Sequence, residues 1–176
     1  MSSSNEVARS AIELDTHNPF GRVILARCLS ARGDLQEAVV ESDAGVRLSG
    51  GRLPFTSQLG YAYARIGEHV RAGEIFKELE ELSKTAYVSP YDFALINTAL
   101  GRNDAAFECL ERALQERTAR LASELRNDPM FDSLRRTPGS KTWRGVLGIR
   151  RKEEVHQMMC SVLSWNFTWL RRSSWI

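Results

Sequence analysis

The feature that most constrains this fold is an internal repeat with a period of 34 residues. Glycines recur at that spacing, and an alanine follows each of them by five positions: Gly33, Gly67, Gly101, and Ala38, Ala72, Ala106. A small residue also stands seven positions before each glycine: Ala26, Gly60, Ala94. Columns that keep one register over three copies predict a stack of similar supersecondary units, each burying its core against its neighbours.

Each copy has the pattern of a helical hairpin. Apolar residues at helical spacing lie on both sides of the glycine, which ends the first helix because glycine readily takes the left-handed conformation. Prolines mark the expected helix starts at Pro19, Pro54 and Pro90, and Ser89–Asp92 has the Ser-x-x-acid spacing of a helix cap. We therefore predict an all-α fold with hairpins over residues 19–52, 53–86 and 87–120.

These columns resemble the tetratricopeptide repeat family. Matching residues in the second and third copies are Leu59, Gly60, Tyr63, Gly67, Ala72, Phe76 and Phe93, Ala94, Gly101, Ala106, Leu110, Ala113. The first copy departs from the pattern, since Ser42 and Gly45 replace the usual packing residues. The resemblance implies an α-solenoid of antiparallel hairpins, preceded by a partial repeat (second helix only) over residues 1–18 and followed by a closing segment over residues 121–136.

A narrower resemblance lies in residues 86–97 and 127–135, which are similar to the last repeat of large bacterial regulators. In those proteins a winged-helix, cyclase-like or kinase domain accompanies the repeats. The resemblance implies a regulatory or sensor portion that binds other proteins, without the activity of such a domain.

The first helix of each hairpin is expected to line a concave groove, with one set of side chains exposed on it. The candidate partner-binding residues on this face are Phe20, Arg27, Tyr61, Arg65, Tyr91 and Leu95. Aromatic residues beside arginines are typical of protein-binding hot spots. The alternative is that the tyrosines shield the seams between helices and that the arginines are solvated.

Composition supports a globular protein with no catalytic centre. The net charge of +2 gives no indication of a nucleic-acid partner, and hydrophobic residues make up 43% of the chain. The three histidines lie in different segments, and the cysteines form no metal-binding or disulfide pattern. We therefore expect no catalytic residue, no cofactor and no metal. The lack of a leader sequence or an apolar span favours the cytoplasm.

The last part of the chain differs from the repeats. Residues 1–134 hold 15 basic and 20 acidic side chains, whereas residues 135–176 hold 9 and 2, together with all four tryptophans. Residues 137–176 are interpreted as a capping helix, as a basic amphipathic element that attaches the array to a membrane, a nucleic acid or a partner, or as the product of a changed reading frame. The last interpretation would make the chain a truncated remnant of a larger regulator, without a function of its own.

Overall fold

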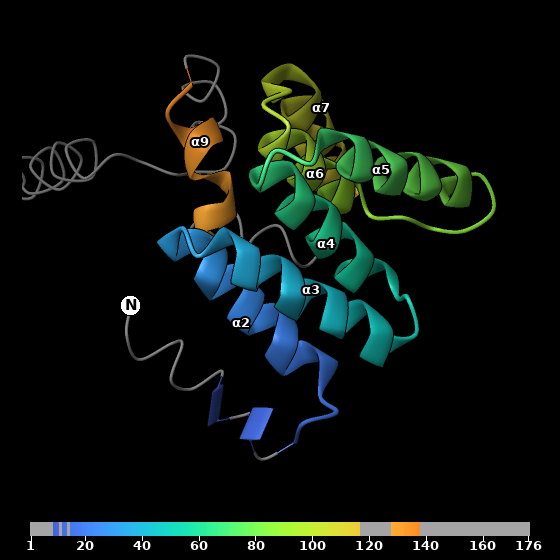
Figure 1. The fold of residues 1–176 in the computed structure, drawn as a ribbon. Helices are drawn as coiled ribbons and strands as arrows, with labels where there is room; N and C mark the ends of the chain where they lie inside the picture. Colours follow the sequence, from blue (N-terminus) through green and yellow to red (C-terminus); the bar gives the residue numbers. More distant parts are fainter. Residues whose placement is uncertain (1–8, 11, 14, 117–127, 138–176) are drawn as a thin grey trace, which may run out of the picture. The chain divides into compact units, whose positions relative to one another are not determined.

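The computed structural model describes residues 9–10, 12–13, 15–116 and 128–137, and these residues form helices and no strand (Figure 1). The chain divides into one unit over Met1–Thr137 and another over Pro138–Ile176. The interpretations of the basic, tryptophan-rich tail thus concern residues outside the described ones, as do residues 1–8 of the expected partial repeat.

The described helices form successive pairs, each within one 34-residue segment. The pairs are α2 (Pro19–Arg32) with α3 (Leu35–Ser49), α4 (Leu53–Arg65) with α5 (His69–Ser83), and α6 (Pro90–Ala99) with α7 (Asn103–Gln115). The first helices are neighbours, because α4 packs against both α2 and α6. Two short elements follow, η1 (Pro129–Phe131) and α9 (Asp132–Arg135), and η1 contacts both α2 and α6.

The helix ends have the predicted local chemistry. Gly33, Gly67 and Gly101 adopt φ values of +95°, +86° and +72°, so the left-handed glycines of the repeat are confirmed. The helices α2 and α6 begin at proline, and Asn18 and Ser89 cap them by accepting hydrogen bonds from backbone N–H groups. Asp92, the acidic residue of the Ser89–Asp92 spacing, accepts a hydrogen bond from the Ser57 hydroxyl on α4, with an O–O distance of 2.7 Å.

The core lies between the hairpins and contains the small-residue columns. Ala38, Ala72 and Ala106 have no exposed surface. A larger apolar cluster joins the second and third hairpins: Leu59, Ile75, Leu79, Val88 and Ile96. At full burial each such side chain stabilises the fold by about 1.5–3 kcal/mol, so the hairpins depend on one another for stability.

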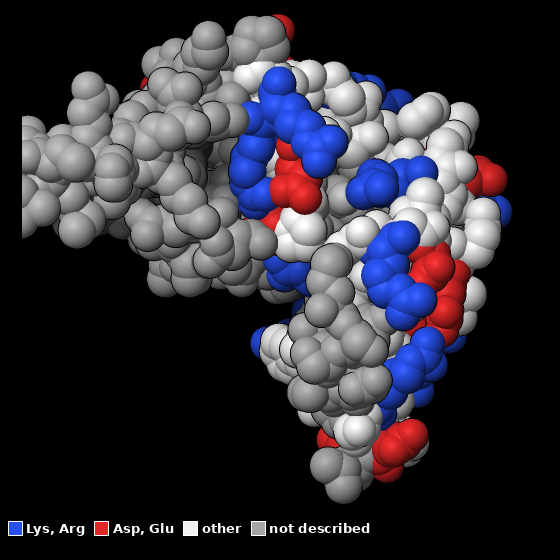
Figure 2. Space-filling model, turned by 90° about the vertical axis from the view of Figure 1, so that its left-hand side faces the viewer, with Lys and Arg blue, Asp and Glu red and all other residues white. Residues whose placement is uncertain are grey.

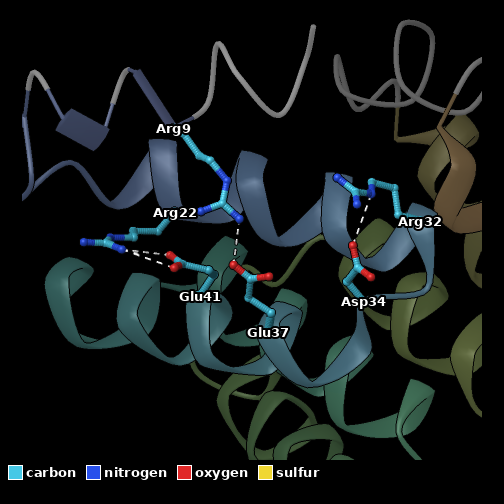
Figure 3. A network of polar contacts seen from close by, with 6 residues as sticks. All are labelled: Arg9, Arg22, Arg32, Asp34, Glu37 and Glu41. Atoms are coloured by element: carbon cyan, nitrogen blue, oxygen red, sulfur yellow. Dashed lines mark hydrogen bonds and ion pairs between the residues drawn. The ribbon is translucent and has the colours of Figure 1, made fainter. Parts of the chain in front are cut away.

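Ion pairs join the N-terminal residues and α2 to α3 (Figure 3). Arg22 Nη1 lies 2.9 Å from Glu41 Oε2, and Arg9 Nη2 lies 2.7 Å from Glu37 Oε1. Exposed pairs contribute about 0–1 kcal/mol each. Burial of Ile12 against α2 adds to the Arg9 pair: its Cγ1 lies 3.2 Å from where a Cβ on Gly21 would stand.

Candidate functional site

The six predicted partner-binding residues lie on the three first helices, but half of them are buried. Phe20 and Arg65 are exposed and Arg27 is half-buried, whereas Tyr61, Tyr91 and Leu95 expose 1%, 1% and 3% of their surface. The expectation that these last three line an open groove is wrong. Tyr91 is covered by the segment formed by η1 and α9, and Tyr61 and Leu95 are buried on helices that pack side by side. The alternative, that the tyrosines shield helix seams, describes them better.

Asp128 is the polar centre of this covered face. Its Oδ2 accepts a hydrogen bond from the Tyr91 hydroxyl at 2.9 Å and forms an ion pair with Arg27 of α2. Its Oδ1 accepts a hydrogen bond from the Met130 N–H at 3.0 Å. The side chain of Asp128 is only 2% exposed, so a residue that stands 101 positions after Arg27 supplies a buried carboxylate to the first hairpin.

Three apolar side chains anchor the same segment. Met130, Phe131 and Leu134 are all buried, and the Phe131 ring meets the Tyr91 ring edge to face with centroids 5.5 Å apart. Aromatic pairs of this geometry contribute about 0.5–1.5 kcal/mol beyond their area burial. We define residues 128–135 as the closing helix-turn segment, which thus has one charged and three apolar anchors.

Tyr61 and Arg65 form a second polar group close to the first. The Arg65 Nη1 donates a hydrogen bond to the Tyr61 hydroxyl at 2.6 Å, and the guanidinium lies 5.6 Å from the ring centroid. Burial raises the pKa of the Tyr61 phenol, the Arg65 charge lowers it and the Asp128 charge raises it. Tyr61 is thus bound directly to Arg65, while the charges of Asp128 and Arg27 also act on its phenol.

Besides Nε of Arg22, two buried polar atoms on α2 and α4 have no hydrogen-bond partner within the part of the chain that the structure describes. They are the Ser30 Oγ and the Gln58 Nε2, and each residue exposes 2% of its surface. Residues three apart on a helix share a face. Ser30 therefore lies on the face of α2 that carries Arg27, and Gln58 on the face of α4 that carries Tyr61.

The remaining predicted residues lie elsewhere on these helices. Phe20 is 59% exposed, and its ring meets that of Phe55 with centroids 5.1 Å apart. Leu95 stands one turn after Tyr91 on α6. Sequence reasoning missed Asp128, Met130, Phe131 and Leu134 as members of this face. The available signal was the Asp-Pro pair followed by apolar residues, which was interpreted only as a closing turn.

The arrangement suits recognition of charged and aromatic groups. Guanidinium groups and tyrosine hydroxyls donate to carboxylates, and such charge-assisted hydrogen bonds are among the strongest in proteins. Burial raises the pKa of the Cys28 and Cys109 thiols, which keeps both protonated and poorly nucleophilic near neutral pH. Basic and acidic side chains adjoin one another on the surface seen in Figure 2.

The comparisons with known proteins return nothing: no family model, no curated protein and no solved structure matches the chain significantly. Among the described residues, no cluster of His, Cys, Asp or Glu could hold a metal ion. None of the described helices is long and apolar enough to cross a membrane.

Proposed function

We propose that residues 19–137 form a tetratricopeptide-type α-solenoid that acts as a non-catalytic protein-binding module. The 34-residue period and the left-handed glycines between paired helices support this proposal. So does the side-by-side packing of α2, α4 and α6, which together form the proposed binding face. By its narrower resemblance, the module would serve a cytoplasmic bacterial regulator and bind an extended segment of a protein partner.

The observation that carries the proposal is the closing helix-turn segment. A short stretch of chain, distant in sequence from α2, is held on α2 and α6 through one carboxylate and a few apolar side chains. A peptide ligand is recognised through the same kinds of contact, with a few anchors supplying most of the affinity. The binding face thus already holds a peptide-like segment of the protein itself.

The proposal is tested by selecting short linear peptides that bind the immobilised full chain and measuring their affinities by calorimetry. Arg65 is exposed and is on the binding face, so Arg65→Ala should weaken the binding of selected peptides about ten-fold, the worth of one charged hydrogen bond. Arg71→Ala is a matched control. Arg71 is also exposed and its guanidinium stacks on a tyrosine, Tyr63, at 5.3 Å, but it belongs to the second helix of its hairpin.

Equal affinities of the two variants for every selected peptide would refute the proposed binding face. Failure to select any binding peptide would refute the proposed function as a whole.

A further inference from the structure

We propose that the closing helix-turn segment, residues 128–135, is an internal ligand of the binding face. The partner that replaces it is an acidic peptide of another protein, with an aromatic side chain three residues after a carboxylate, the spacing of Asp128 and Phe131. This inference rests on the proposed function and adds the chemistry and the regulation of the same face.

The polar contacts define the first requirement on such a partner. Two side-chain donors, the Tyr91 hydroxyl and the Arg27 guanidinium, meet at Oδ2 of Asp128. A buried tyrosine hydroxyl and a half-buried guanidinium that converge in this way select an acid over a neutral side chain, since an amide cannot balance the charge of the arginine. A competing peptide therefore needs a carboxylate at this position.

The apolar contacts define the second requirement. The Phe131 ring lies against the Tyr91 ring, 1% of each residue being exposed. One turn of 3-10 helix, started by the hydrogen bond from the Met130 N–H to Asp128, sets the distance between the acid and the aromatic ring. A peptide with the same acid-to-aromatic spacing can form this turn and fill both positions.

The face is not fully satisfied by its internal ligand. Among the described residues Arg65 has no carboxylate partner, and the Ser30 Oγ and the Gln58 Nε2 have no hydrogen-bond partner. Buried polar atoms without partners disfavour the state that contains them. An external peptide that offers a second acid to Arg65 and a carbonyl oxygen to Gln58 makes contacts that residues 128–135 do not make, so it can displace them.

Covalent attachment sets the strength of the competition. A segment linked to its own site acts at an effective concentration of the order of millimolar. Weakening the internal segment should therefore raise the apparent affinity for an external peptide, even though the altered residue belongs to the segment and not to the helices.

The test uses the full chain and a fluorescein-labelled peptide that copies residues 128–135, with blocked ends, and measures binding by fluorescence anisotropy. We expect the Asp128→Asn and Phe131→Ala proteins to bind this peptide at least ten-fold more tightly than the original protein does. Ser133→Ala is the matched control, because Ser133 is exposed on the same segment, and it should bind like the original protein. A peptide with alanine at the position that copies Phe131 should bind each of these proteins more weakly than the unaltered peptide does.

Other outcomes would overturn the inference. Equal peptide affinity of the original and both altered proteins, with all three unfolding cooperatively, would mean that the segment does not compete. Loss of cooperative unfolding in both altered proteins would make the segment part of the core. A dimer in which two copies exchange the segment would mean that the partner is a second copy of this chain and not a peptide of another protein. In all these cases, peptides selected independently that bind through Arg65 would leave the proposed function intact.

Discussion

Gly60 offers the sharpest test of how tightly the second and third hairpins pack. A Cβ added at this position would stand 2.8 Å from Cδ1 and 3.1 Å from Cγ1 of Ile96, and 3.0 Å from Cγ2 of Ile75. Carbon atoms at ideal contact are about 3.5–4.0 Å apart. Ile96 has no exposed surface, so any shift of its side chain must be taken up by its packed neighbours.

The size of the effect follows from two opposing contributions. Replacing glycine by alanine inside a helix stabilises by about 0.5–1 kcal/mol, whereas overfilling a packed core costs about 1–3 kcal/mol. We expect Gly60→Ala to destabilise the protein by about 1–2 kcal/mol net. Gly73→Ala is the matched control, since Gly73 is also inside a helix, α5, and nothing lies within 4 Å of its added Cβ. This control should be stabilised by about 0.5–1 kcal/mol.

The assay is urea unfolding followed by circular dichroism, in which a shifted midpoint at an unchanged slope reports a change in stability alone. Ile96→Val removes the closest atom, Cδ1, at a cost of about 0.5–1.5 kcal/mol. The double variant with Gly60→Ala should therefore be more stable than the sum of the single effects predicts. If Gly60→Ala stabilises the protein as much as Gly73→Ala does, the reasoning about this contact is refuted.

Three further predictions concern the binding face and a helix end. Arg27→Met should lower the free energy of unfolding by up to about 3–5 kcal/mol, since it leaves the Asp128 charge buried without its partner. Asp128→Asn should lower it less, because the Arg27 side chain is 23% exposed and reaches water. The opposite order of stabilities in urea unfolding would contradict this prediction. Burial raises the pKa of Tyr61, so the folded state holds the phenol proton more tightly than the unfolded state does. The stability that this shift contributes is complete below about pH 10 and is lost as the pH rises further. Tyr61→Phe should therefore reduce the loss of stability in unfolding curves measured from pH 9 upward. Gly67→Ala should destabilise the protein by about 1–2 kcal/mol, the cost of a left-handed residue with a Cβ, with Gly67→Asn costing less; equal melting temperatures for all three proteins would show that this helix end is not constrained.

Much of the local structure was predictable because it depends on residues close together in the sequence. The glycines of the period end the first helices with positive φ, and prolines stand in the first turns of α2, α4 and α6. In each case the local backbone chemistry or the helical period was sufficient.

The face that carries Arg27, Tyr61 and Tyr91 was predicted less well, because helical periodicity identifies a face but not what covers it. Tyr61 and Tyr91 were expected on an exposed surface, and both are buried. The contact that binds Tyr91 and Arg27 to the end of the array comes from Asp128, a residue outside the repeat whose own neighbours in sequence give no periodic signal. A long-range contact of this kind is a property of the packed chain and has no counterpart in the spacing of residues.

One repeat column shows what the register of the repeat determines and what the packing of neighbouring side chains determines. The column that holds Ala26, Gly60 and Ala94 was expected to be small in every copy, and all three residues are buried. The reason for glycine in the second copy comes from residues far along the chain, because atoms of Ile96 and Ile75 lie 2.8 Å and 3.0 Å from where a Cβ on Gly60 would stand. The period thus places a small residue in this column, and at position 60 the neighbouring side chains of Ile75 and Ile96 favour glycine over alanine.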